Sequence, residues 1–521
     1  MHKLRIGIID LVTKGPTRAL YARVMNANFA SIMPQVVAVW CSEAGHDVVL
    51  VCYTGFEDLV DELPERVDLV FISAFTEAAH TAYALSALFR SHGAVTALGG
   101  PHARCYPLDA TQYFDYVLGL TDKSVIQSIL QDCSRHRPRG VFLGSSRQPT
   151  TLPGVQERWP FIVATLRKAP ALKVVPMLGS LGCPYKCSFC IDSVVPYQTL
   201  DFRLMKEDLS FLAGKFKRPR VGWHDPNFGV RFDDYMDAIE AAVPPDSVDF
   251  IAESSLSLLS EAHLKRLKRN GFKGLLPGIE SWYGLGEKSR TGNASGIDKV
   301  GRVAEHVNMI LRYVPYVQTN FVFGMDIDEG PEPFELTKRF VDLVPAAYPS
   351  IHLLTAFGQA APINLEYQRA NRVIPLPFHF LNNSHGINVK PKNYTWREFY
   401  DRVIDLRKYV VSWRAIARRL RAGQALIPRW LNLVRAVSVG GRGCVRYNAE
   451  VRRRLDTDLK LRRYFDQEST ALPEFYEDQV RKDLGPLWSW LPAGALYHDP
   501  NGWLRTLNQA GTGETQARDR S

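Results

Sequence analysis

Three cysteines lie close together in residues 179–192, which read GSLGCPYKCSFCID. Cys183, Cys187 and Cys190 have the spacing CxxxCxxC, and the 521-residue chain has eight cysteines in all. Three thiolates at this spacing can hold three irons of a cubane [4Fe–4S] cluster and leave the fourth iron open. A structural zinc site needs a closed set of four ligands, and the sequence has no second cysteine pair. The pattern therefore predicts a catalytic cluster, with a chance grouping of buried cysteines as the alternative.

The composition is that of a globular protein, with 46% hydrophobic and 23% charged residues. A chain of this length predicts about three domains. It has no apolar run of the roughly 20 residues that span a bilayer, so no transmembrane segment is expected. The first residues, MHKLRIGIID, resemble a strand rather than a signal peptide. The remaining cysteines are scattered and suggest no disulfide framework, so we expect a cytoplasmic protein.

Residues 1–135 alternate between short apolar runs and helical patterns. The apolar runs are RIGIID, DVVLVCY, DLVFISA, VTALGG and YVLGL. This alternation predicts a doubly wound α/β domain, in which helices cover both faces of a parallel sheet. Small residues follow two of the strands, at Ser73 and at Gly99–Gly100. That edge of an open α/β sheet is where ligands bind.

Residues 136–172 carry Pro, Ser and Arg without a clear period and are expected to form a linker. A second alternating series follows over 173–380, with six strand candidates. Six βα units predict a partial (β/α)6 barrel of the TIM type, whose chemistry lies at the carboxyl ends of the strands. The candidate residues at those ends are Cys183, Asp225, Glu253, Glu280 and Gly324.

Residues 381–508 are predicted to form a helical domain, and the polar residues 509–521 to be disordered. The net charge of +10 is concentrated here, because residues 390–470 contain 20 Lys and Arg against 8 Asp and Glu. A basic segment can meet nucleic acid, anionic lipid or an acidic partner, or it can simply be a solvated helical face. No specific nucleic acid is expected, because no DNA-reading motif is present. The segment WRAIARRLRAGQALIPRWLNLVRAV is basic and amphipathic enough to contact a membrane, which would fit a lipid-like substrate.

The cysteine motif and the segments after it resemble the radical S-adenosylmethionine (SAM) superfamily, over residues 170–375. Phe189 precedes the last cysteine, as in that family. HDPNF (224–228) resembles the segment that holds the SAM amino group, GIES (278–281) a second SAM contact, and VFGMD the glycine motif near adenine. The loop LLTAFGQAAP keeps the family pattern only in part. The resemblance implies SAM-binding roles for Phe189, Asp225, Asn227, Glu253, Ser254, Gly278, Glu280, Ser281 and Gly324.

The N-terminal domain resembles a cobalamin-binding domain. That family carries DxHxxG, SxL and GG after successive strands. This chain has Asp10, Val12 and Gly15 at the first motif, Ser73 and Phe75 at the second, and Gly99 and Gly100 at the third. Valine replaces the histidine, so the resemblance implies a cobalamin whose cobalt has no protein ligand from that position. A flavodoxin-like fold that does not bind cobalamin is the alternative.

Together the two resemblances imply an enzyme that reductively cleaves SAM and methylates an unactivated carbon of a small-molecule substrate. Such an enzyme needs a one-electron donor such as flavodoxin or ferredoxin. An enzyme with both cofactors that catalyses a cyclisation or rearrangement without methyl transfer is one alternative. A non-enzymatic iron–sulfur or cobalamin sensor is another.

Overall fold

The computed structural model describes residues 3–133, 139–422 and 425–508. Its first sheet has six parallel strands in the order β2-β1-β3-β4-β5-β6. The strands are β1 (Arg5–Leu11), β2 (Asp47–Tyr53), β3 (Leu69–Ala74), β4 (Val95–Gly99), β5 (Tyr116–Leu118) and β6 (Val141–Leu143). The doubly wound α/β fold predicted for the first part of the chain is confirmed.

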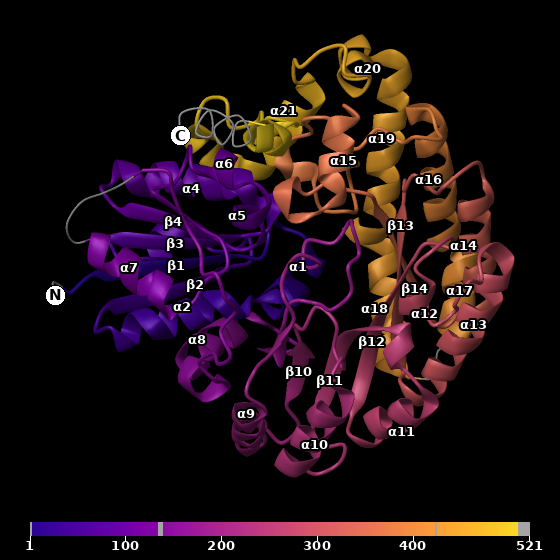
Figure 1. Ribbon diagram of the computed structural model, residues 1–521, viewed down its shortest axis with the longest axis horizontal. Helices are drawn as coiled ribbons and strands as arrows, with labels where there is room; N and C mark the ends of the chain where they lie inside the picture. Colours follow the sequence, from indigo (N-terminus) through magenta and orange to yellow (C-terminus); the bar gives the residue numbers. More distant parts are fainter. Residues whose placement is uncertain (1–2, 134–138, 423–424, 509–521) are drawn as a thin grey trace, which may run out of the picture.

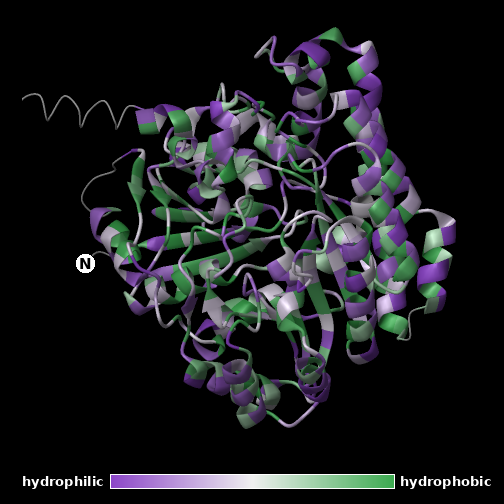
Figure 2. Cartoon of the chain, turned by 45° about the vertical axis from the view of Figure 1, so that its right-hand side comes forward, coloured by the Kyte–Doolittle hydropathy of each residue, from purple (hydrophilic) through white to green (hydrophobic). Residues whose placement is uncertain are grey.

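Helices cover both faces of this sheet, with α2 and α7 on one side and α4 on the other (Figure 1). The strands are therefore buried on both faces, which explains why they are hydrophobic along their length (Figure 2). The helices of this part are α1 (Leu20–Met25), α2 (Ile32–Glu43), α3 (Leu59–Glu62), α4 (Ala79–Ser91), α5 (Pro101–Cys105), α6 (Pro107–Ala110) and α7 (Lys123–Cys133).

The segment 136–172 differs from the linker expected there. β6 extends the first sheet beside β5, and α8 (Val155–Lys168) packs on α2 and α9. Gly154 begins α8, with its amide bonded to the Glu157 carboxylate at 2.7 Å. The repeated prolines suggested a loop, but Pro160 lies inside the helix and the strand spans only three residues. Residues 134–138 lie outside the described part.

The second sheet is an open barrel of six parallel strands in the order β14-β13-β12-β11-β10-β7. The strands are β7 (Val174–Met177), β10 (Arg220–Trp223), β11 (Asp249–Ser255), β12 (Phe272–Glu280), β13 (Tyr316–Phe323) and β14 (Tyr348–Leu353). The helices between them are α9 (Phe202–Lys215), α10 (Phe232–Ala242), α11 (Glu261–Arg269), α12 (Gly286–Ser289), α13 (Gly296–Tyr313) and α14 (Glu332–Leu343). The predicted partial (β/α)6 barrel is confirmed.

Mostly helical structure follows β14, as expected, and it closes that edge of the barrel (Figure 1). In α16, the Arg407 guanidinium donates to the Ile351 carbonyl of β14 at 3.1 Å, so this helix lies against the last strand. The helices are α15 (Ile363–Arg369), α16 (Trp396–Val410), α17 (Trp413–Ala422), α18 (Leu426–Val437), α19 (Cys444–Thr457), α20 (Leu459–Phe465) and α21 (Glu474–Leu484). The prediction of disorder for 509–521 lies outside the described residues.

No single helix in the described ranges is long and apolar enough to cross a membrane; by length and composition, only the bent pair 21–29 and 32–43 passes that test.

The two sheets meet at their carboxyl edges. Arg104 in α5, just after β4, forms an ion pair with Asp192 of the cysteine segment at 3.1 Å. The Tyr106 hydroxyl donates to the Ala356 carbonyl, just after β14, at 2.9 Å. These contacts bring the ligand-binding edge of each sheet to a common boundary, where the candidate site lies.

Candidate functional site

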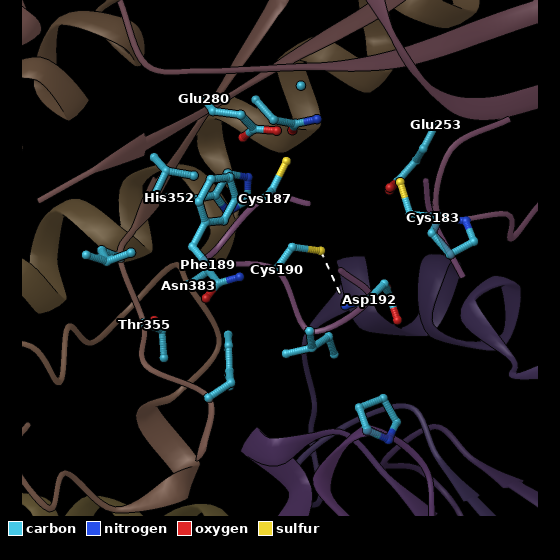
Figure 3. A pocket seen from close by; sticks show the side chains of 18 of the residues that line it. Cys183, Cys187, Phe189, Cys190, Asp192, Glu253, Glu280, His352, Thr355 and Asn383 are labelled. Carbon is cyan, nitrogen blue, oxygen red and sulfur yellow. Dashed lines mark hydrogen bonds between the residues drawn. The ribbon is translucent and has the colours of Figure 1, made fainter. Parts of the chain in front are cut away.

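The main cavity of the site has a volume of about 530 Å³ and is lined by residues at the carboxyl ends of the barrel strands. Figure 3 shows the side chains that line it. Cys183, Cys187 and Cys190 line it together. The other sequence-predicted residues that line it are Phe75, Phe189, Asn227, Glu253, Ser254, Gly278 and Glu280. Residues from the first sheet, from four barrel strands and from the C-terminal part therefore converge on one space.

Backbone contacts fix the shape of the cysteine segment. Gly182 has φ of +68°, and a side chain there would meet the carbonyl oxygens of Val195 and Pro196. This close approach requires glycine. Cys190 donates its amide to the Cys187 carbonyl at 3.0 Å, which makes a tight turn between the last two cysteines. The Ser188 carbonyl accepts from the amide of Ile363, so α15 anchors the segment from the other side.

The three thiols are free and sit in a partly desolvated environment. Burial raises the pKa of all three, that of Cys190 to about 11, while the ammonium of Lys288 opposes the rise. Coordination to iron deprotonates a thiol outright, so such groups fit a metal-bound role better than a free nucleophile. Within the described residues, no three His, Cys, Asp or Glu side chains converge tightly enough to hold a single ion. In a cubane cluster each thiolate binds a different iron, so the three sulfur atoms need not converge on one point. The three cysteines fit such a cluster because they line one cavity.

Glu253 and Glu280 line the cavity beside the cysteines (Figure 3), and the cation Lys288 lines it as well. Glu280 has φ of +67° at the end of β12 and forms an ion pair with Lys288 at 2.6 Å. Although burial lowers the pKa of Lys288, the Glu280 carboxylate and the charges of Cys187 and Cys190 together more than offset this effect and raise the pKa overall. Burial and the neighbouring Glu280 charge raise the pKa of Glu253. This part of the lining therefore combines two carboxylates with one neutralising ammonium, and Glu77 and Asp192 line the cavity elsewhere.

Asn227 presents a buried polar atom to the cavity. Its side-chain oxygen accepts from the Ser255 amide at 2.8 Å and from the Ser255 hydroxyl at 2.9 Å. Its amide nitrogen is buried and has no hydrogen-bond partner among the described residues. A buried donor without a partner is costly, so this atom is suited to an acceptor on a bound molecule.

Asp225 lies behind the cavity wall rather than in it. Its carboxylate accepts from the Gly179 amide at 3.1 Å, from the Ser180 hydroxyl at 2.7 Å and from the Tyr235 hydroxyl. Burial raises its pKa, and these donors oppose that effect. Asp225 thus fixes the start of the cysteine segment.

Two further predicted residues also lie outside the cavity lining. Gly324 has φ of +96° and packs against Ile387 and Phe399. Ser281 accepts from the Tyr283 amide at 3.1 Å, and its carbonyl accepts from the buried Lys299 ammonium at 2.7 Å. Both positions support the backbone around the cavity.

A second cavity of about 320 Å³ lies at the carboxyl edge of the first sheet. Ser73, Phe75, Gly99 and Gly100 line it, as the sequence motifs led us to expect. Gly100 has φ of +90°, and a Cβ there would lie 2.9 Å from the Ala74 carbonyl oxygen. The two cavities share wall residues, namely Phe75, Pro101, Asp192 and Pro226. A molecule in one cavity therefore borders on a molecule in the other.

The first motif of the N-terminal domain lies away from both cavity linings. The Asp10 carboxylate accepts from the Ser31 amide at 2.6 Å, and burial raises its pKa to about 6. Val12 donates its amide to the Tyr53 carbonyl at 3.3 Å. Gly15 packs against the backbone carbonyl of Asp483, which leaves no room for a side chain.

Several cavity residues were missed in the sequence. Lys288 lies in a polar run with no motif, and its role follows only from its ion pair with Glu280. Gln318 and Asn320 point to the same side of β13, where their amides are linked at 2.7 Å. His352 near the end of β14 shares a hydrogen bond of 3.0 Å with the Ser350 hydroxyl, and burial lowers the pKa of His352 to about 4. For the residues of β13 and β14, the signal in the sequence was a polar residue inside an otherwise apolar strand.

Similarity to known proteins agrees with this geometry, although no protein-family model matches the chain. Bacteriochlorophyllide d C-12(1)-methyltransferase of Chlorobaculum tepidum is 23% identical over 361 residues, which are 68% of this chain and 77% of that protein. The structure of the radical S-adenosylmethionine methyltransferase TsrM from Kitasatospora setae, with cobalamin and a [4Fe-4S] cluster bound, matches with a TM-score of 0.50. The sequence identity is 15%, and the match covers 70% of this chain and 78% of that one.

A second solved structure covers almost the whole chain. The cobalamin-dependent S-adenosylmethionine radical enzyme OxsB, with aqua-cobalamin and S-adenosylmethionine bound, matches with a TM-score of 0.51 and 12% identity over 94% of this chain and 83% of that one. The chain has the fold of a cobalamin-dependent radical SAM enzyme. In this radical SAM fold, the cysteine motif and the second cavity occupy the facing edges of the two sheets.

Proposed function

We propose that the protein is a cobalamin-dependent radical SAM enzyme that methylates an unactivated carbon of a small-molecule substrate. One observation carries this proposal. The cavity that holds the CxxxCxxC cysteines shares a wall with the cavity at the glycine-rich edge of the first sheet. Two cofactors held in these cavities would border on each other, as transfer of a group between them requires.

Cys183, Cys187 and Cys190 would hold a [4Fe–4S] cluster, because these three free thiols line the main cavity from one short segment. The fourth cysteine of the lining, Cys105, is buried at the end of α5. When bound, such a cluster supplies the electron for reductive cleavage of SAM. The unpartnered Asn227 amide and the Glu253, Ser254, Gly278 and Glu280 wall would bind and orient SAM. Phe189, half-buried between the cysteines, would exclude water from the reacting atoms.

Ser73, Phe75, Gly99 and Gly100 would hold the cobalamin, which supplies a methyl carrier when bound. Gly99 fits this role because a Cβ there would meet only the Leu118 side chain, at 3.9 Å, so its bare backbone borders open space. In this proposal residues 1–135 bind cobalamin, residues 173–380 form the radical SAM core, and residues 381–508 close the barrel.

The proposal includes a one-electron donor such as flavodoxin or ferredoxin, because reductive cleavage consumes an electron that the chain does not carry. It also includes a cytoplasmic location, which fits the seven cysteines with free thiols at positions 41, 52, 105, 183, 187, 190 and 444. A lipid-like substrate is proposed on account of the amphipathic helices α17 and α18.

The test is anaerobic reconstitution with iron, sulfide and hydroxocobalamin, followed by addition of SAM and dithionite. We expect 5′-deoxyadenosine by mass spectrometry and bound corrinoid in the visible spectrum. The variant with Cys183, Cys187 and Cys190 all changed to Ala should yield neither cluster nor 5′-deoxyadenosine. Cys133→Ala, at a half-buried position on α7, is the matched control and should retain both.

The outcomes separate the alternatives. A cluster that forms while SAM stays intact under reduction would contradict the enzymatic proposal and favour a sensor. With SAM carrying a deuterated methyl group, a product heavier by that labelled group supports methylation. A product formed without added carbon would instead indicate a cyclisation or rearrangement.

A further inference from the structure

An apolar surface covers the outer side of α17 and α18, and we call it the α17–α18 face. Most large hydrophobic side chains of the molecule are buried, but these are open to solvent. The exposed fractions are 64% for Trp413, 72% for Leu426, 60% for Ile427, 65% for Trp430, 40% for Val434 and 41% for Val437. A contiguous exposed patch of this kind marks an interaction surface rather than ordinary surface variation.

The charge around this face has one sign. Residues 406–449 contain ten Arg and Lys and no Asp or Glu. Arg414 and Arg421 are exposed beside the apolar residues, and the Arg442 guanidinium stacks on the Trp413 ring at 4.2 Å. The acidic group that faces α17 from another element is Asp342 of α14, which pairs with Arg418. The face therefore combines tryptophans with arginines, as surfaces that lie in a lipid headgroup region do.

A further cavity borders α18. It has a volume of about 210 Å³ and lies between α16, α18 and strand β14. Arg407 and Arg435 line it, and no acidic residue of the described chain does. Gln318 and His352 line both this cavity and the main cavity that holds the cysteines. The cavity thus lies between α18, which contributes Arg435, and the main cavity, with which it shares a wall.

We propose that the α17–α18 face docks on an anionic lipid bilayer, and that the enzyme takes an amphiphilic substrate from that membrane through the arginine-lined cavity. The second half of this proposal rests on the proposed function. The bilayer is preferred over a second copy of the chain because the face is uniformly basic, so two copies would bring like charges together. On such a bilayer the tryptophan rings would lie at the headgroup level and the arginines would reach the lipid phosphates. The apolar and the basic residues of the face would then both have partners.

Sedimentation with lipid vesicles tests the docking, using the full chain. Vesicles of mixed phosphatidylglycerol and phosphatidylcholine should carry the protein down, and vesicles of phosphatidylcholine alone should carry down much less. A variant with Trp413, Leu426, Ile427 and Trp430 all changed to Ser should lose binding by about tenfold or more. The matched control changes Ile297 and Leu459 to Ser, which are 58% and 61% exposed on other elements, and should bind as the wild type does.

Charge is tested separately. Arg414→Gln with Arg421→Gln should weaken binding to the anionic vesicles and leave the weak binding to phosphatidylcholine unchanged. Raising the salt to about 1 M should have a similar effect, because the screening length falls to about 3 Å. If the quadruple variant does not fold, brominated phosphatidylglycerol provides a second measurement. It should quench the tryptophan fluorescence of the wild type and quench Trp430→Phe less.

Three results would overturn the docking proposal. The wild type could stay in the supernatant with anionic vesicles, or the quadruple variant could sediment as the wild type does. Light scattering could instead show a wild-type dimer that becomes monomeric in the quadruple variant, which would assign the face to a second copy. Formation of 5′-deoxyadenosine without vesicles is measured in parallel. If the wild type forms no 5′-deoxyadenosine, the proposed function is contradicted. If it forms 5′-deoxyadenosine but does not sediment with anionic vesicles, only the docking is contradicted.

Discussion

Asp225→Asn tests whether Asp225 supports the cysteine segment or binds SAM directly. The carboxylate accepts three hydrogen bonds, from Gly179, Ser180 and Tyr235. Asparagine has one acceptor oxygen, which can keep the hydrogen bonds from Ser180 and Tyr235. Its side-chain NH2 group then faces the Gly179 amide, so two donors meet and that hydrogen bond is lost. A buried donor left without its acceptor costs about 1–3 kcal/mol. Because asparagine also escapes the desolvation that raises the pKa of Asp225, we expect the lower half of that range.

The assay combines denaturant unfolding with iron content and SAM binding by equilibrium dialysis. We expect a lower free energy of unfolding and less iron per chain in Asp225→Asn. The SAM dissociation constant of the iron-loaded fraction should change by less than about threefold. Asp405→Asn is the control, because Asp405 is 63% exposed in a surface ion pair with Lys338 and its substitution should cost little. Unchanged stability and iron content with at least about tenfold weaker SAM binding would refute the supporting role.

Three further perturbations test other parts of the site. Lys288→Met removes the cation beside Glu280, so the cluster should become harder to reduce, by tens of millivolts in a redox titration followed by electron paramagnetic resonance; an unchanged potential would contradict this. Gly100→Ala should reduce bound corrinoid in the visible spectrum because its Cβ meets the Ala74 backbone, whereas Gly45→Ala, at a similar φ but in open space, should not; equal loss in both would indicate strain alone. Burial raises the pKa of Asp328 to about 7, so its carboxyl keeps its proton in the folded chain at pH values where the unfolded chain has lost it. Folding stability should therefore fall as pH rises from about 4 to 7, by up to about 4 kcal/mol from this group, and Asp328→Asn should lose correspondingly less in denaturant unfolding at pH 5 and 8; identical pH profiles would contradict the assignment.

The two sheets, apart from β6, were predictable because each of the other strands is a short apolar run bounded by loop residues. β6 spans only three residues inside the segment expected to be a linker. The second series gave all six barrel strands in order, since sequential parallel strands joined by helices allow few arrangements. α8 was missed because Pro160 lies in its interior, where a proline usually ends or kinks a helix. Local patterns thus predicted the elements except where a residue that usually ends a helix, such as Pro160, lies inside one.

The site was only partly predictable. Cys183, Cys187 and Cys190 could be found because their spacing is a local signal. Whether Asp225 faces the cavity or the loop behind it depends on Tyr235 and Gly179, which approach it only in the folded chain. Similarly, Lys288 becomes a site residue through a contact with Glu280 that no local pattern announces. Residue type and spacing predict chemistry, but the direction of a side chain depends on packing between elements.

The wall that the two cavities share restricts how this protein can change. Phe75 and Asp192 border both spaces, and Asp192 also bonds Arg104 of the other sheet. A substitution at either position changes the shape of both cavities. A change that improves binding in one cavity therefore also alters binding in the other. Asn320 of β13 borders the main cavity but neither the cavity at the first sheet nor the arginine-lined cavity. Redesign of substrate choice should therefore begin on β13, where the amino acid can vary without disturbing the opposite pocket.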